Sequence, residues 1–115
     1  MEQHTDMFGN SLRRGDFLCY PGRTGSSLYV NLAVFYKNKL NGKIQVIIPS
    51  VRWDRDDEGH SFQEEVYRKT SVEVLDRVIK IPIEYFHNDN ITTELRGKAA
   101  KLVDIQEKVL EGFFD

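Results

Sequence analysis

The chain has 115 residues, of which 40% are hydrophobic and 30% are charged, and its formal net charge is −2. This length predicts one domain with one core, and this composition is typical of a soluble globular protein rather than a disordered or membrane protein. No apolar run approaches the roughly 18 residues of a membrane span, and the N-terminal residues lack the features of a secretory signal, so we expect a cytoplasmic protein without membrane contact.

The single cysteine agrees with that expectation. Cys19 cannot form an internal disulfide, as is usual in a reducing compartment. It lies between Leu18 and Tyr20 in an apolar run, so we interpret it as a buried thiol rather than a reactive one. The three histidines are scattered, and no pair of candidate ligands has the spacing of a metal site. We therefore expect no enzyme, no catalytic residue, no metal and no cofactor.

Short strands are predicted from the first half of the chain. Residues 1–12 show no periodicity and are interpreted as an N-terminal arm. The turn pair Gly15-Asp16 precedes an apolar run at 17–20, which predicts a strand ending at Pro21-Gly22. Residues 28–37 and 44–48 alternate between apolar and polar, and Asn41-Gly42 between them suits a two-residue hairpin turn. A hairpin is predicted here, and Pro49 closes its second strand or marks a sheet edge.

The middle of the chain is less regular. Residues 54–60 form a charged loop, and residues 62–70 fit either a strand or a short helix. Residues 72–82 are β-rich, with the alternation slipping near 75–77 as it would at a bulge. Four or five strands in about 70 residues suit a small barrel.

The last segment changes to helical periodicity. The polar run 87–90 supplies N-cap candidates, and a helix of about five turns is predicted after it. Its wide apolar face covers an open side of its own barrel or, alternatively, a partner's helix. One predicted stripe is Ile91, Leu95, Ala99, Leu102, Val109 and Phe113, with Gln106 as its polar member, and a second is Val103, Leu110 and Phe114.

The predicted fold is therefore mainly β with a C-terminal α-helix, in the α+β class. We expect a small SH3-like barrel of four or five antiparallel strands covered by one long helix. The expected organisation is an N-terminal arm at 1–12, the barrel at 13–86, and the helix at 87–115, packed on the barrel or extending from it.

The glycine-bearing loop at 22–27 raises the question of phosphate binding. Gly22 and Gly25 are three residues apart, no lysine follows and a strand comes next, which excludes a Walker A loop. The loop is hydroxyl-rich and its backbone amides can approach a phosphate. The alternative is an ordinary turn whose glycines supply positive φ.

An acidic stretch resembles a calcium-binding loop in its spacing. Counting Asp54 as the first position places Asp56, Glu58, Gly59 and Glu65 at the third, fifth, sixth and twelfth. No helix is predicted before it, and Glu58 is long for its position. A solvated acidic loop is the preferred interpretation.

Charge is distributed unevenly along the chain. Residues 11–52 contain seven basic side chains and one acidic, whereas residues 54–115 contain nine basic and fifteen acidic. Aromatic residues lie among the cations of the first half, and on a small barrel such a mixture can stack on bases and bind phosphates. The alternative is that these aromatic side chains are core, which alternation supports for Tyr36 and leaves open for Tyr29 and Phe35.

Part of the chain resembles a known family. The elements are Arg14-Gly15-Asp16-Phe17, then Gly22 and Gly25, then Ala33-Val34-Phe35 and Ile44-Gln45-Val46. Together they look like the KOW and SH3-like barrel pattern over residues 13–48, with Ala33 where that pattern commonly has glycine. The resemblance implies a role in ribosomes, transcription complexes or nucleic-acid binding.

The sequence is compatible with three functions. The first is a non-enzymatic, nucleic-acid-binding or transcription-associated protein, with DNA or RNA as partner; a phage accessory factor would also suit this size. The second is an adaptor or inhibitor that binds a host or partner protein through the acidic second half. The third is a homodimer formed through the C-terminal helix. The predicted nucleic-acid-binding residues are Arg13, Arg14, Arg23, Thr24, Ser26, Ser27, Tyr29, Lys37, Lys39, Lys43, Arg52 and Trp53.

Overall fold

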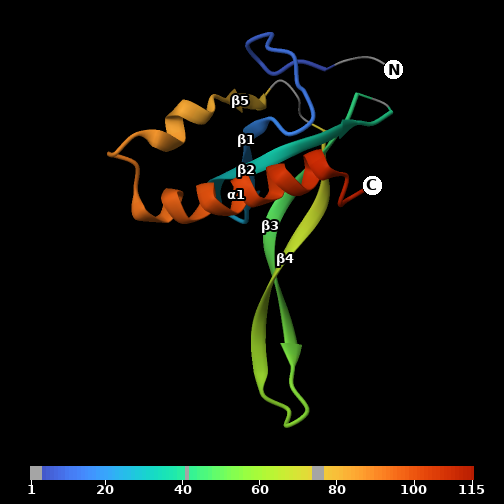
Figure 1. Ribbon diagram of the computed structural model, residues 1–115, viewed down its shortest axis with the longest axis vertical. Helices are drawn as coiled ribbons and strands as arrows, with labels where there is room; N and C mark the ends of the chain where they lie inside the picture. The colour runs from blue at the N-terminus through green and yellow to red at the C-terminus, as the bar shows by residue number, and fades with distance from the viewer. Residues whose placement is uncertain (1–3, 41, 74–76) are drawn as a thin grey trace.

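The computed structural model describes residues 4–40, 42–73 and 77–115, without the side chains of Arg23, Thr24, Ser27 and Leu28. Within them, five antiparallel strands form one sheet in the order β4-β3-β2-β1-β5, and one α-helix follows (Figure 1). The predicted mainly β fold with a C-terminal helix is confirmed. The elements are β1 Phe17–Thr24, β2 Ser27–Asn38, β3 Ile44–Arg55, β4 Ser61–Val72, β5 Ile79–Ile81, the 3-10 helix η2 Ile83–His87 and α1 Thr93–Glu111.

The expected closure into a barrel is wrong, because the sheet is open. Its two edges are β4 and β5, which do not pair with each other. β5 is only three residues long and pairs with β1 alone, from Phe17↔Ile81 to Cys19↔Ile79. β4 pairs only with β3 and follows it away from the rest of the sheet (Figure 1). A barrel requires its edge strands to meet, and these two point to different parts of the molecule.

The long third and fourth strands resolve two ambiguous predictions. Residues 62–70 are strand rather than helix, because β4 pairs with β3 from Ile44↔Val72 to Arg55↔Ser61. β3 does not close at Pro49 but continues for six residues to Arg55. Pro49 does mark an edge, since β2 pairs with β3 only up to Val34↔Ile47. Asn41 of the predicted turn and residues 74–76 of the predicted bulge lie outside the described residues.

Each face of the sheet carries a hydrophobic core, because successive residues of a strand point to opposite faces. On one face, Phe17, Val34, Tyr36 and Ile47 pack against α1. The other face is covered in part by the N-terminal segment, through Leu12. This second core consists of Leu12, Leu18, Ala33, Phe35, Ile44, Val46, Val72 and Val78. The sequence prediction that Tyr36 is core is confirmed, and Phe35 is also buried.

The helix begins after Thr92, not within the predicted capping run 87–90. The Thr92 hydroxyl accepts a hydrogen bond from the Leu95 N–H at 3.2 Å. Gly112, at φ 83°, ends the helix in the left-handed conformation that glycine adopts without strain. The residues that α1 buries are Ala99, Leu102, Ile105 and Val109.

The second predicted stripe of this helix is wrong for Val103 and Leu110, which are exposed, whereas Phe114 packs against the core under α1. Phe113, predicted in the first stripe, is also exposed. Ile105, which the sequence interpretation left out, is fully buried. α1 therefore packs on the sheet through the single stripe of its buried residues.

Asp6 attaches the N-terminal segment to β5. Its carboxylate accepts hydrogen bonds from the backbone N–H groups of Phe8 and Asn10, at 3.0 and 2.8 Å, and from that of Lys80 at 2.9 Å. The Asn10 side chain adds a bond at 3.1 Å. Burial acts to raise the pKa of Asp6, but these hydrogen bonds outweigh it and hold the pKa below its ordinary value.

We therefore expect Asp6→Asn to lower the free energy of unfolding by about 1–3 kcal/mol at pH 7, because the amide presents N–H groups where the carboxylate accepts bonds. Because the pKa is lower in the native state, the carboxylate stabilises the fold above its unfolded pKa of about 3.9. This stabilisation is lost as the pH falls through the native pKa. The difference between variant and wild type should thus shrink below about pH 4. Urea unfolding at several pH values measures this effect.

Asp57→Asn is the matched control, since Asp57 is exposed and its replacement should change stability by less than about 0.5 kcal/mol. A loss at Asp6 that persists unchanged at pH 2 would contradict this role for its carboxylate.

Candidate functional site

The structure distributes the predicted cations over three separate regions. Arg14 and Lys37 lie beside Tyr36, near the C-terminal residues. Lys39 and Lys43 lie where β2 turns into β3, and Arg52 lies far along β3. Arg13 and Ser26 are exposed. The side chains of Arg23, Thr24 and Ser27 are outside the described residues.

Carboxylates accompany three of these cations. Arg14 forms an ion pair with Asp115, and Arg52 forms one with Glu64. Lys43 lies 2.9 Å from a carboxylate oxygen of Glu73. Each acid comes from the second half of the chain, so folding brings the two oppositely charged halves together. These three cations therefore do not contribute to one continuous positive surface.

Three cations of the described residues meet around the ring of Tyr36. The Arg14 guanidinium carbon lies 4.9 Å from the ring centroid, Lys37 Nζ 5.4 Å and Lys69 Nζ 5.0 Å. The Tyr36 hydroxyl donates to a carboxylate oxygen of Asp115 at 2.6 Å, which is the main reason that the pKa of Tyr36 is raised. Lys69 donates to the Phe114 carbonyl at 2.6 Å. Phe114 and Asp115 at the C-terminus are thus already the polar partners of Tyr36, Arg14 and Lys69.

The predicted strand end at Pro21-Gly22 is wrong, because β1 continues to Thr24. The loop considered for phosphate at 22–27 is therefore mostly strand, and only Gly25-Ser26 form the β1–β2 turn. Gly25 has φ 59°, as the interpretation of an ordinary turn expects. A Cβ atom at Gly22 would lie 2.3 Å from the Tyr29 ring, so Gly22 is needed for this close approach. Both glycines therefore have a conformational or packing role in the hairpin.

The outer halves of β3 and β4 form a two-stranded arm, defined here as residues 50–66. It runs away from the sheet and α1 (Figure 1). Its last pairs are Trp53↔Gln63, Asp54↔Phe62 and Arg55↔Ser61. In the turn, Asp56 Oδ1 accepts hydrogen bonds from the N–H groups of Glu58 and His60, at 3.0 and 2.8 Å. The fold core does not include any residue of this arm.

The arm is acidic and carries large exposed apolar side chains. It contains Arg52 and Arg55 against six carboxylates, a net charge of −4. Trp53 is 66% exposed, and Val51 and Phe62 are also exposed. The six acids are Asp54, Asp56, Asp57, Glu58, Glu64 and Glu65.

The residues of the calcium-binding pattern do not lie together as one site in this arm. Asp54 and Glu65 lie on paired strands, and the register places them on opposite faces, because Glu65 pairs with Val51 and Asp54 with Phe62. Within the described residues, no group of three or more acidic, histidine or cysteine side chains could hold a metal ion. The acidic residues instead give the arm its charge.

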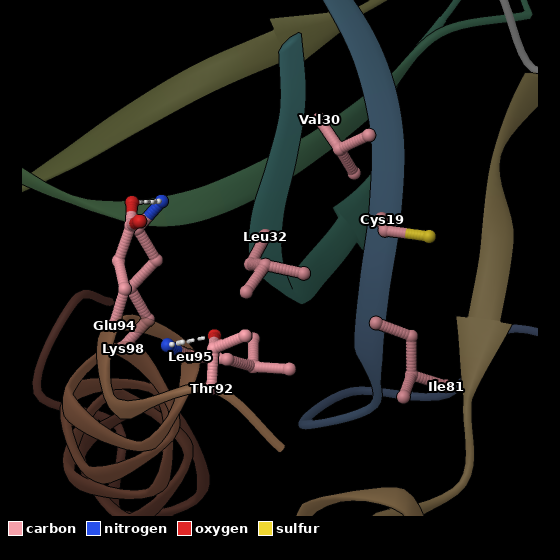
Figure 2. A pocket seen from close by; sticks show the side chains of 8 residues that line it. All are labelled: Cys19, Val30, Leu32, Ile81, Thr92, Glu94, Leu95 and Lys98. Carbon is pink, nitrogen blue, oxygen red and sulfur yellow. Dashed lines mark hydrogen bonds and ion pairs between the residues drawn. The ribbon is translucent and has the colours of Figure 1, made fainter. Parts of the chain in front are cut away.

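An apolar pocket of about 370 Å³ lies between the sheet and the first turns of α1 (Figure 2). Its walls include Cys19, Val30, Leu32, Ile81 and Leu95. Burial raises the pKa of the Cys19 thiol, which favours a packing role over a nucleophilic one. The polar groups at the rim already have partners, since Lys98 pairs with Glu94 at 3.3 Å and Thr92 caps the helix.

Comparison with known proteins found no matching family model, no matching curated protein and no matching solved structure. The resemblance to KOW and SH3-like barrels therefore stays a prediction. Among the described helices, none is both long and apolar enough to span a membrane.

Proposed function

We propose that this protein is a protein-interaction module whose contact element is the arm at residues 50–66. The observation that carries the proposal is Trp53, 66% exposed on a two-stranded extension with a net charge of −4. Trp53 forms exposed apolar surface with Val51 on the same face of β3, and exposed apolar patches mark interaction sites. Tryptophan is also among the residues that most often dominate binding energy. The charge favours a partner with a basic surface.

The arm's independence from the core supports the same proposal. An isolated two-stranded hairpin is marginal in water, and this one contributes no residue to either hydrophobic core. Stability of the domain therefore gives no reason for its length. Binding to another protein does, because an extension presents both faces and both edges to a partner.

Nucleic-acid binding, the first hypothesis from the sequence, becomes the second, because the carboxylates beside Arg14, Lys43 and Arg52 count against it. A polyanion would have to displace those acids or bind beside them. Self-association through α1 is also less favoured, since the helix directs its buried stripe toward its own sheet.

The test compares two aromatic residues of equal exposure. Trp53 lies on the arm and Tyr85, 65% exposed, lies on η2. We expect full-length protein to capture a partner from lysate, Trp53→Ala to reduce the captured amount at least tenfold, about 1.4 kcal/mol or more, and Tyr85→Ala to leave it unchanged. Quantitative mass spectrometry of the captured proteins measures the amounts.

Nuclease treatment of the lysate separates the two hypotheses. Capture that survives nuclease and depends on Trp53 supports the arm as a protein-binding element. Capture that disappears with nuclease, or that Trp53→Ala leaves intact, refutes it.

A further inference from the structure

We propose that the edge of β3 along the arm accepts an extended segment of the partner as an added β-strand, with basic and apolar residues alternating in that segment. This inference rests on the proposed function and specifies its binding mode. The edge concerned is the side of β3 that faces away from β4, between Pro49 and Arg55. Strand addition of this kind uses main-chain hydrogen bonds for affinity and side-chain pockets for selectivity.

The sheet leaves this edge without a neighbouring strand among the described residues. β2 pairs with β3 only from Asn38↔Ile44 to Val34↔Ile47. Its earlier part, from Ser27, follows β1 instead. The two hairpins therefore diverge beyond Ile47, and the arm leaves the sheet with β4 as its single companion strand (Figure 1).

The hydrogen-bond pattern shows which backbone groups face this edge. Asp56 donates its N–H to the His60 carbonyl at 3.0 Å, so the even-numbered residues of β3 bond toward β4. On the other side, Lys39 donates to the Lys43 carbonyl at 2.9 Å, so odd-numbered residues bond toward β2. Beyond Ile47, the N–H and C=O groups of Val51 and Trp53 therefore point to the edge that β2 has left.

Pro49 fits this arrangement. Its position is odd, so the missing N–H is on the edge side, where a proline is tolerated in a strand. It has no N–H to donate to β2 at this point of the ladder. An added strand would therefore bond from Val51 outward.

Apolar surface lies at the base of the same edge. A cavity of about 110 Å³ opens where β2 and β3 separate, lined by Val30, Leu32, Ile48 and Pro49, with Leu102 of α1 and polar neighbours. An apolar cavity on the order of 150 Å³ can hold benzene, so this one has room for an aliphatic side chain. It shares Val30, Leu32 and Lys98 with the larger pocket of Figure 2.

Side chains along the edge extend that apolar surface. Val51 and Trp53 are two and four residues beyond Pro49 and share its face of the strand. A bound segment with an apolar residue at every second position would meet them. The other face of this edge carries Ser50, Arg52 and Asp54. Arg52 is already paired with Glu64, so basic residues of the segment would meet Asp54 and the negative field of the arm. The same net charge of −4 disfavours pairing between two copies of this chain.

The opposite edge of the arm is a poorer acceptor. β4 carries exposed Glu64 and Glu65 within the arm and exposed Arg68 and Lys69 just beyond it, and charged residues commonly protect an edge strand. Tyr67 and Lys69 are also engaged by α1 and the residues after it, through Asp104 and the Phe114 carbonyl.

The test uses a synthetic peptide that alternates lysine and valine, with the full-length protein. Trp53 is the sole tryptophan of the chain, so its fluorescence reports binding directly. We expect saturable binding of this peptide and at least about tenfold weaker binding of a glutamate and valine counterpart, as expected when like charges meet across strands. On binding, the Val51 and Trp53 amides should gain protection from hydrogen exchange.

Two variants at one position isolate the main-chain contribution. Val51→Pro removes an N–H from the free edge without removing a bond to β4, whereas Val51→Thr keeps it. We expect Val51→Pro to weaken peptide binding about three- to tenfold relative to Val51→Thr, as the loss of one hydrogen bond predicts. Far-UV circular dichroism checks that both variants keep the fold.

Equal affinity of the two variants, or no peptide binding at all, overturns strand addition. In that case, partner capture that still depends on Trp53 leaves the arm as the contact element, so the two proposals fail separately. If Trp53→Ala leaves capture intact, the proposed function itself fails.

Discussion

Replacement of Ile105 by alanine is expected to lower the free energy of unfolding by about 2–5 kcal/mol, the range for deleting a buried aliphatic side chain. Ile105 is fully buried between α1 and the sheet, in the cluster that also contains Leu102 and Val34. Removal of its branched side chain leaves a cavity there, in the cluster through which α1, the α-helix of the described structure, packs on the sheet. The total free energy of unfolding of a small domain is only about 5–15 kcal/mol, so the expected loss is a large share of it.

Val103→Ala is the matched control on the same helix. Val103 is 38% exposed, and we expect a change within about 0.5 kcal/mol, since surface substitutions usually have small effects and alanine favours helix. Urea unfolding followed by far-UV circular dichroism is the measurement. Tryptophan fluorescence is unsuitable, because Trp53 lies on the arm rather than in the core. Equal losses for the two variants would contradict the observed orientation of α1.

Removal of the arm is expected to abolish partner capture while leaving the fold intact. Ser50 and Val66 are an even-numbered pair that exchanges hydrogen bonds, so residues 51–65 can be replaced by Asn-Gly in a two-residue hairpin turn. Both hydrophobic cores and the contacts of Tyr67 remain. The arm's ion pair between Glu65 and Lys101 is lost, but exposed ion pairs contribute only about 0–1 kcal/mol.

The free energy of unfolding of the shortened protein should therefore lie within about 1 kcal/mol of the wild-type value. Its urea m-value should be smaller, because less surface becomes exposed on unfolding. Capture experiments with the two proteins, at equal concentration, measure the functional loss. Loss of the cooperative transition would show that the arm is structural. Retained capture would place the contact surface elsewhere.

The candidate site was only partly predictable from the sequence. Trp53 was identified among residues that bind a ligand, and the acidic stretch was identified as a possible contact surface for a protein. The alternation of Val51 and Trp53 could have extended the strand past Pro49. No local pattern, however, indicates that β3 and β4 leave the sheet together, because this depends on where β2 stops pairing.

For the basic residues of the first half, the sequence predicted a shared surface that the structure does not form. Seven basic residues between 11 and 52 suggested one positive surface, yet Arg14 meets Asp115 and Lys43 meets Glu73. These pairs join residues that are distant in the sequence. Charge counted along a chain predicts a surface only when neighbours in sequence are also neighbours in space.

The sequence by itself determined the local elements: the alternating strands, the α-helix with its main apolar positions, and the mainly β class. These depend on side-chain periodicity and on glycine and proline, which act within a few residues. Only the tertiary structure decided that the sheet stays open, that Ile105 rather than Val103 is buried, and that residues 50–66 extend as an acidic arm. Those outcomes depend on strand order, on the length over which strands pair and on contacts between distant segments, which no local pattern encodes.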